Sequence, residues 1–368
     1  HYKVLLAKKE QFHSQQLSML EKSLKESWTW RIGNLFTGTT VMIINLIKNP
    51  AKFYRDSLFR RSVNRNANNI PSKNRIDDSI TTKPDQSKIK TNSILGLKDK
   101  VPMLPVVRID NKPVIAAVMD EFTTACFDPE CTLITFRPDN WEDKVSQQSP
   151  EAIFVESAWN GNQGSWQYKI AKYHRNMGDE LDELVSWAKS YHIPTIFWNK
   201  EDPPNFDRFI EKAKLFDYIF TTDEDCISKY REHIQHNNVY ALPFAAQPEL
   251  HNPINDLKRA YNVCFAGTYH ADEYHERQND MEILLNPAMK YDLHIYDRNY
   301  GTVGPGTERF RFPEKYQPFI KGRLNYNDMV KAYHQYKVFL NVNSVKNSPT
   351  MFSRRVFELL ASGTPVIS

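Results

Sequence analysis

The C-terminal stretch from residue 338 to residue 368 constrains the fold more than any other part of the chain. It opens with a short apolar run, residues 338–343, that is biased toward β-branched side chains. A polar loop with Pro349 follows, then a helical pattern that Gly363 closes, then a second apolar run from Pro365 to Ile367. This order predicts a strand, a loop, a helix and a second strand, which together make one parallel α/β unit.

The loop and the first turn of this helix predict an anion-binding site. Open α/β folds bind ligands at the carboxyl edge of the sheet, where a helix N-terminus offers free N–H groups. Arg354 and Arg355 add positive charge there, and Glu358, about one turn further on, could accept two hydrogen bonds from a ribose diol. A diphosphate at the loop and a diol at the acid describe a nucleotide sugar. The alternative stays open that these charges only solvate the exposed face of the helix.

A sequence signature supports the first interpretation. Glu358-Leu-Leu-Ala-Ser-Gly-Thr-Pro-Val-Ile matches the pattern E-x-x-A-x-G-x-P-V-I and resembles the C-terminal signature of GT-B glycosyltransferases. The longer string N-V-N-S-V, S-P-T-M-F and R-R-V-F-E is similar to the CgeB-like branch, named for a spore-coat glycosylation protein. The family's earlier acidic residue, eight positions before that Glu, falls on Thr350 here. The resemblance covers most of residues 113–368.

The resemblance implies two Rossmann-like domains that face each other across a cleft, and sugar transfer from a nucleotide-sugar donor, most simply a UDP-sugar, to a hydroxyl group. It implies no bound metal and no further cofactor, because Arg277, Lys321 and the helix beginning near Arg354 would neutralise the diphosphate. Glu358 would hold the ribose, so Glu358→Ala should weaken nucleotide binding and move the melting temperature only slightly. The donor-binding residues implied are Gly267, Thr268, Arg277, Lys321, Asn343, Ser344, Met351, Phe352, Ser353, Arg354 and Glu358.

Residues 113–244 alternate short apolar runs with amphipathic helical patterns, one of which is the stripe Leu181, Leu184, Val185 and Ala188. This alternation predicts a mostly parallel sheet with helices on both faces. The expected strands are Val114–Met119, Thr132–Phe136, Ala152–Val155, Pro194–Trp198, Tyr218–Thr221 and Val239–Phe244.

The strand pattern restarts at Tyr261 after a polar joint between Pro248 and Pro253. Tyr291–Tyr296 and Phe319–Gly322 read as further strands, and a helical stripe of Met329, Ala332, Tyr333 and Tyr336 leads into the C-terminal stretch. We therefore expect an acceptor domain over residues 101–250 and a donor domain over residues 251–368. The donor domain looks incomplete, because the GT-B pattern normally continues after the Pro-Val-Ile strand.

Several carboxylates directly follow the expected strands of the first domain and should gather at one sheet edge. Asp120 or Asp202 would orient or deprotonate the acceptor hydroxyl if the reaction inverts the anomeric centre. A retaining reaction needs no such base, and the sequence leaves both outcomes open. Either residue could instead serve only as a helix cap or turn residue.

Residues 1–61 predict a helical, basic extension, and residues 62–100 a flexible linker. Leu17, Leu20 and Leu24 favour an amphipathic helix or coiled-coil arm that could form a homo-oligomer. Residues 28–61 are too often interrupted by polar residues for a membrane span. They could lie on an anionic membrane surface, or form a helical hairpin packed on this chain or on a second copy.

Charge and cysteine content narrow the function classes. Residues 1–65 carry twelve Lys/Arg against four Asp/Glu while the whole chain is +4, so the positive charge is local, and we expect no nucleic-acid partner. The four cysteines lack C-x-x-C spacing, which indicates neither a disulfide scaffold nor a zinc site and fits a location in the cytoplasm or at the inner face of the membrane. The expected acceptor is a cell-envelope, capsule or coat glycan, or a lipid-linked one. A sugar-nucleotide epimerase and a non-catalytic scaffold with a transferase-like fold remain the alternatives.

Overall fold

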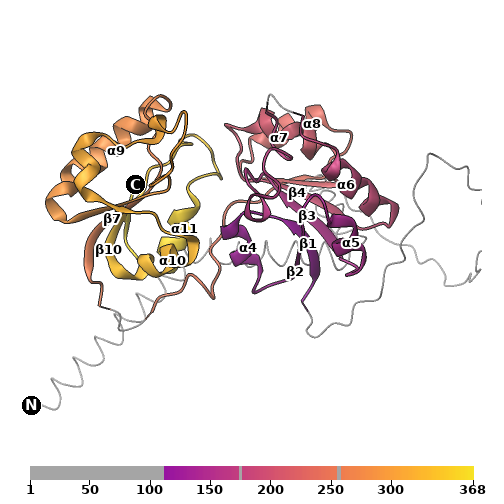
Figure 1. Cartoon of the computed structure of the whole chain (residues 1–368), viewed down its shortest axis with the longest axis horizontal. Helices are drawn as coiled ribbons and strands as arrows, with labels where there is room; N and C mark the ends of the chain where they lie inside the picture. The colour runs from indigo at the N-terminus through magenta and orange to yellow at the C-terminus, as the bar shows by residue number, and fades with distance from the viewer. Residues whose placement is uncertain (1–111, 174–175, 255–257) are drawn as a thin grey trace, which may run out of the picture.

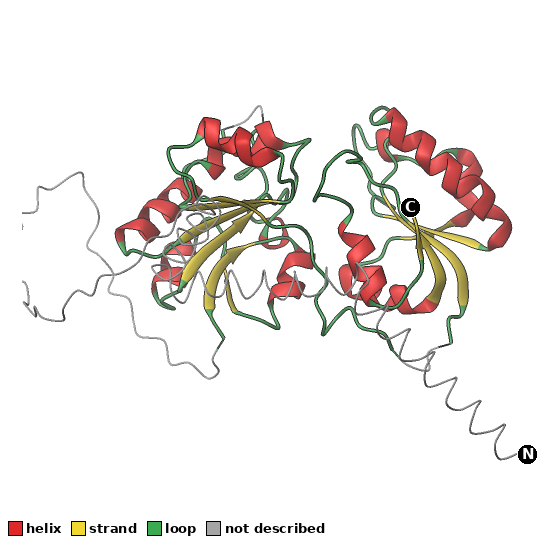
Figure 2. Ribbon diagram, turned by 180° about the vertical axis from the view of Figure 1, so that it is seen from behind, coloured by secondary structure: helices red, strands yellow, loops and turns green. Residues whose placement is uncertain are grey.

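The structure is a computed structural model that describes residues 112–173, 176–254 and 258–368. The expectations for residues 1–61 and 62–100 lie outside this described part. Two parallel α/β units follow one another along the chain, each with helices on both faces of its sheet (Figures 1 and 2). The expected fold class, two Rossmann-like domains of the GT-B type, is confirmed for the described residues.

The first domain contains a parallel sheet in the order β2-β1-β3-β4-β5-β6. Its strands are β1 (Val114–Val118), β2 (Thr132–Thr135), β3 (Ala152–Glu156), β4 (Thr195–Asn199), β5 (Tyr218–Thr221) and β6 (Val239–Ala241). Its helices are α4 (Glu121–Phe127), α5 (Trp141–Ser146), α6 (Glu180–Ser190), α7 (Phe206–Ala213) and α8 (Cys226–His233).

Both faces of the first sheet are buried, because side chains alternate across a strand and helices cover both sides. In β1, Val114, Ala116 and Val118 enter one core cluster, whereas Ile115 and Ala117 enter the cluster on the opposite face. The predicted helical stripe is confirmed: Leu181, Leu184, Val185 and Ala188 are all buried on α6.

The second domain contains a parallel sheet in the order β11-β10-β7-β8-β9. Its strands are β7 (Tyr261–Gly267), β8 (Leu293–Asp297), β9 (Ile320–Gly322), β10 (Tyr336–Leu340) and β11 (Val366–Ile367). Its helices are α9 (His275–Ala288), α10 (Tyr326–Gln335) and α11 (Arg354–Ala361). The predicted strand, loop, helix and strand of the C-terminal stretch are therefore present as β10, α11 and β11, with β10 and β11 paired in parallel.

The core of the first domain extends into the second. Phe357 of α11 belongs to the buried cluster on one face of the first sheet, and Met351 and Phe352 pack against the same cluster. In both views α4 of the first domain and α11 of the second face each other across the boundary (Figures 1 and 2). These contacts fix the carboxyl edges of the two sheets next to each other.

Some predicted boundaries were wrong, because the apolar character of a residue does not show whether its backbone pairs with a neighbouring strand. Tyr336 was assigned to the helical stripe, but α10 ends at Gln335 and Tyr336 begins β10. Tyr291 precedes β8, which begins at Leu293. Leu242 and Phe244 follow β6 as loop residues and are nevertheless buried against the first sheet.

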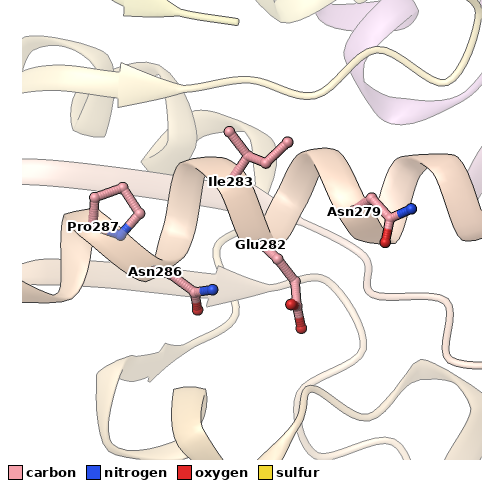
Figure 3. A pocket seen from close by; sticks show the side chains of 5 residues that line it. All are labelled: Asn279, Glu282, Ile283, Asn286 and Pro287. Carbon is pink, nitrogen blue, oxygen red and sulfur yellow. The ribbon is translucent and has the colours of Figure 1, made fainter.

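None of the helices in the described part of the chain combines the length and the apolar character of a bilayer-spanning segment. The surface hollow in Figure 3 is lined by Asn279, Glu282, Ile283, Asn286 and Pro287, all on the outer face of α9. The core residues Met281 and Leu285 lie on the opposite face of this helix. The hollow is thus separate from the carboxyl edge where the sequence predicts the donor.

Candidate functional site

Arginine side chains gather at the carboxyl edge of the second sheet, around the end of β7. Arg277 donates from Nη1 to the carbonyl oxygen of Thr268 at 2.9 Å, and Arg355 donates to the carbonyl oxygen of Ala266. The backbone N–H of Arg298, the first residue after β8, donates to the carbonyl oxygen of Gly267 at 3.1 Å. The first turns of α9 and α11 and the end of β8 thus bring Arg277, Arg355 and Arg298, here called the arginine cluster, to one place.

The guanidinium groups of the arginine cluster repel one another. Burial, and next the positive charge of Arg355, lowers the pKa of Arg277. Burial, and next the charges of Arg355 and Arg354, lowers the pKa of Arg298 to about 10, although this side chain keeps contact with solvent. Nε of Arg355 is buried without a hydrogen-bond partner. A bound anion would relieve the repulsion and supply the missing acceptor.

Gly267 lies against the arginine cluster. A side-chain carbon added at Gly267 would stand 3.2 Å from the Phe265 ring and 3.9 Å from Nη2 of Arg277. The missing side chain therefore leaves backbone next to a guanidinium group, the arrangement in which a phosphate can approach a main chain closely. The predicted donor residues Gly267, Thr268 and Arg277 come together here.

The sequence predictions missed Arg298 and left Arg355 out of the donor set. The available signal was position: Arg298 directly follows the run that forms β8, and parallel strands bring such residues to one edge. Arg355 was noticed as a charge beside Arg354. The structure separates these neighbours, because Arg355 points to the end of β7 and Arg354 to Glu358.

Glu358 lies inside the protein at the domain boundary and is fully buried. Its Oε1 accepts a hydrogen bond from the Tyr326 hydroxyl at 2.8 Å, and its Oε2 accepts one from the Tyr333 hydroxyl at 2.6 Å. Arg354, one turn earlier on α11, forms an ion pair with the same carboxylate. A ribose could reach this carboxylate only after a tyrosine had moved, and the predicted ribose contact stays a prediction.

His251 completes the surroundings of Glu358. Its Nδ1 accepts the backbone N–H of Gln247 at 2.9 Å, so a neutral ring carries its proton on Nε2 and donates it to the Tyr326 hydroxyl at 2.9 Å. Burial lowers the pKa of His251 and outweighs the opposing charge of Glu358. The ring is therefore held neutral, in a single tautomer.

Cys126 of α4, His251 and Glu358 each place a possible metal-ligand atom within 4.8 Å of the others. The Tyr326 hydroxyl contacts all three residues, with Cys126 Sγ at 3.5 Å. Burial also raises the pKa of the Cys126 thiol to about 11, whereas a metal ligand must be a thiolate. A metal ion at this point would have to displace the Tyr326 hydroxyl, so we assign these residues to a hydrogen-bonded junction between the domains.

A second buried charge cluster lies at the carboxyl edge of the first sheet. Nζ of Lys200 lies 2.8 Å from Oδ2 of Asp120 and 2.9 Å from Oε1 of Glu156. The same ammonium group stands 4.1 Å from the ring centroid of Phe122, and the guanidinium carbon of Arg354 stands 4.0 Å from it. Phe122 thus contacts a cation from each domain.

The two predicted acceptor-side acids differ in access. Asp120 accepts hydrogen bonds from the Gly161 backbone N–H and from Lys200, so each of its oxygens has a partner. Asp202 is fully buried and accepts hydrogen bonds from Asn199, Thr221 and Tyr230. Burial raises the pKa of Asp202 to about 7, but a substrate has no path to this carboxyl group.

The remaining predicted donor residues are spread over three places. Oδ1 of Asn343 accepts the Ser353 backbone N–H at 2.9 Å, which folds the loop back to the start of α11. The Ser353 side chain does not cap α11, and Ser344 is exposed on the same loop. Met351 and Phe352 pack against the first domain, as described above. Lys321 is exposed on the edge strand β9, where its charge adds to burial in lowering the pKa of His294 of β8.

Thr350, which stands where the resembling family has an acid, links the two domains. Its hydroxyl donates to the carbonyl oxygen of Thr222 at 2.8 Å and accepts the backbone N–H of Glu224 at 3.0 Å. The loop before α11 therefore reaches the carboxyl edge of the first sheet.

Comparison with known families gives a match to the C-terminal part of the chain. Residues 277–368 match the glycosyl transferase-like family. This segment contains the arginine cluster, α10 and α11, and the match confirms the expected resemblance to glycosyltransferases for these residues. A search of curated proteins found no match.

Solved structures with a similar arrangement include several sugar-nucleotide enzymes. An alpha-glucosyltransferase in complex with UDP and DNA is 10% identical, with 70% of this chain and 79% of that chain covered and a TM-score of 0.45. Anabaena HepE in complex with UDP and glucose is 9% identical, with 70% and 80% covered and a TM-score of 0.39. A UDP-N-acetylglucosamine 2-epimerase from Rickettsia bellii is 12% identical, with 62% and 73% covered and a TM-score of 0.33. Similarity at this level does not discriminate among their activities.

Proposed function

We propose that this protein is a glycosyltransferase that moves a sugar from a nucleotide-sugar donor to a hydroxyl acceptor. The observation that carries the proposal is the arginine cluster at the carboxyl edge of the second sheet. Three guanidinium groups, one with a buried N–H that lacks a partner, converge beside Gly267 without a carboxylate partner among the ion pairs of the described residues. The glycosyl transferase-like match over residues 277–368 supports the same activity.

The arginine cluster would act on the leaving group. When the bond between the anomeric carbon and the diphosphate oxygen breaks, its electron pair stays on the diphosphate. Arg277, Arg298 and Arg355 would stabilise this charge by charge-assisted hydrogen bonds in a partly desolvated place. We propose that they replace the divalent ion of metal-dependent transferases and that the base is uracil. The acceptor oxygen forms the new bond to the anomeric carbon and gives up its proton.

Two finer expectations from the sequence remain part of the proposal. The CgeB-like resemblance favours a cell-envelope, capsule or coat glycan as acceptor. The basic residues 28–61 favour a cytoplasmic protein that touches the inner face of the membrane.

Isothermal titration with UDP, GDP, CMP and TDP tests the proposal on the whole chain. We expect saturable binding of one nucleotide. Arg298→Ala or Arg355→Ala should weaken it about ten- to a hundredfold, because a hydrogen bond to a charged group contributes about 1.5–3 kcal/mol. Arg231→Ala serves as a matched control, since this exposed arginine lies in the last turn of α8, at the opposite edge of the first sheet. Equal loss in all three variants would contradict the assignment of the site.

A non-catalytic scaffold is the second candidate, and two observations favour it. Glu358 is engaged by Tyr326, Tyr333 and Arg354, and Thr350 replaces the family's earlier acid and joins the domains. Absence of binding for every nucleotide would support the scaffold. An epimerase would instead convert its sugar nucleotide without any acceptor.

A further inference from the structure

We propose that Glu201, and not Asp120 or Asp202, is the carboxylate that receives the proton of the acceptor hydroxyl, and this inference rests on the proposed glycosyl transfer. The reaction it describes inverts the anomeric centre. Glu201 is the second residue after β4, an interior strand of the first sheet, so it lies at the carboxyl edge that faces the second domain.

Elimination among the neighbouring carboxylates leads to Glu201. Glu156 and Asp202 are fully buried, and hydrogen bonds or ion pairs occupy them. One oxygen of Asp120 forms an ion pair with the buried Lys200, and the other accepts the Gly161 backbone N–H. Glu201 is partly exposed, and its side-chain partners are the uncharged groups Trp159 and Asn205, the latter at 3.2 Å from Oε2.

The charge of Glu201 acts on the arginine cluster. It raises the pKa of Arg298, in opposition to burial and to the charges of Arg355, Arg354 and Arg277, so the carboxylate and this guanidinium group interact across the domain boundary. Glu201 is partly exposed and Arg298 is exposed, so solvent reaches both side chains. We place the acceptor hydroxyl between Glu201 and a donor bound to the arginine cluster.

The surroundings of Glu201 suit a proton acceptor. Burial raises its pKa, and the charge of Lys200 and a hydrogen bond from Trp159 oppose the rise without cancelling it. A raised pKa brings the carboxylate closer to the proton affinity that general base catalysis at neutral pH requires. Trp159 packs edge-on against Phe209 and Tyr173, with ring centroids 5.2 Å and 6.1 Å away, so its ring is held in place beside the carboxylate.

The proposed step balances as follows in atoms and electrons. The acceptor oxygen bonds to the anomeric carbon on the face opposite the diphosphate, and its proton moves to Glu201. The bond from the anomeric carbon to the diphosphate oxygen breaks, and its electron pair leaves with the diphosphate. When water is the acceptor, the products are the nucleoside diphosphate and the free sugar with inverted configuration.

Hydrolysis of UDP-glucose by the whole chain, followed by proton NMR, tests this inference with water as the acceptor. We expect Glu201→Gln to lower kcat about 10²–10⁴-fold, the usual contribution of a general base, while the Kd for UDP from titration stays unchanged. Glu211→Gln is the matched control, because this glutamate is exposed on α7 and pairs with Lys214. The wild-type rate should fall as the pH drops through the raised pKa of Glu201, whose charged neighbours are Lys200, Asp120 and Arg298. The Glu201→Gln variant should not show this fall in rate at low pH.

The outcomes separate the inference from the function on which it rests. Absence of UDP binding by the wild-type protein, or loss of binding that does not depend on Arg298, would overturn the proposed function. Normal UDP binding with a Glu201→Gln rate equal to that of Glu211→Gln would overturn only the role of Glu201. Release of glucose with retained configuration would overturn it as well.

Discussion

The guanidinium carbon of Arg354 lies 4.0 Å from the ring centroid of Phe122 and joins a helix of the second domain to a helix of the first. The same guanidinium group pairs with Glu358. The second cation at the Phe122 ring, Lys200, pairs with Asp120 and Glu156. A single aromatic side chain thus connects the buried charge clusters of both domains. The candidate donor site and the candidate acceptor site are held next to each other through this contact.

Phe122→Leu should destabilise the protein, because leucine keeps apolar volume but offers no π face to the two cations. We expect the free energy of unfolding to fall by about 1–2 kcal/mol, the range of a partly desolvated cation–π contact. Urea denaturation measures it. Phe127→Leu is the comparison, since Phe127 also packs on the first domain but its ring partner is Phe154. A smaller loss for Phe122→Leu than for Phe127→Leu would count against the bridging role.

Glu358→Ala should destabilise the protein strongly, contrary to the small effect that the sequence alone led us to expect. The change leaves Arg354 buried without its counter-charge and removes the acceptor of two tyrosine hydroxyls. Breaking a buried ion pair costs about 3–5 kcal/mol.

A double-mutant cycle with Arg354→Met checks the origin of this loss. The double variant should be less destabilised than the sum of the single variants, because no unpaired charge remains. A melting temperature of Glu358→Ala within a few degrees of the wild type would show that the carboxylate is not a structural partner.

His251 should make stability depend on mildly acidic pH. Its pKa in the folded state lies below the unfolded value of 6.5, so the unfolded chain binds the proton more readily. The contribution of the neutral ring is therefore complete above about pH 6.5 and is lost as the pH falls toward the folded pKa. A protonated ring would also carry a proton on Nδ1, so Nδ1 could no longer accept the hydrogen bond from the Gln247 N–H.

Denaturation curves between pH 4.5 and 8 for wild type and His251→Asn measure this dependence. The free energy of unfolding should fall less steeply with acidification in His251→Asn than in the wild type. His192→Asn is the control, because His192 is exposed and has a φ of 58°, which asparagine accepts. If the free energy of unfolding falls equally steeply with acidification in His251→Asn and in the wild type, His251 is not the source of the pH dependence.

Nucleotide binding should not require a divalent ion, because the arginine cluster supplies the positive charge. We expect the Kd for UDP to be the same in EDTA and in magnesium chloride, while Arg298→Ala weakens binding in both. Binding that disappears in EDTA and returns with magnesium would show that a metal ion takes part.

The sequence by itself determined the local elements of this protein. The runs of β-branched and aromatic residues predicted the strands, and the spacing of Leu181, Leu184, Val185 and Ala188 predicted a buried helix face, because such periodicities report burial directly. The resemblance to GT-B glycosyltransferases implied that Gly267, Thr268 and Arg277 bind the donor, and the structure brings these three residues together.

Only the tertiary structure decided which charged side chains find partners. In the sequence Glu358, Asp202 and Glu201 are all carboxylates expected near a sheet edge, and no local pattern shows which of them stays accessible. In the fold Glu358 is enclosed by residues up to 107 positions away in the chain, such as His251, and Asp202 by Asn199, Thr221 and Tyr230. Glu201 stays partly exposed, and its charge acts on Arg298. Accessibility depends on contacts between distant segments, and no local pattern encodes those contacts.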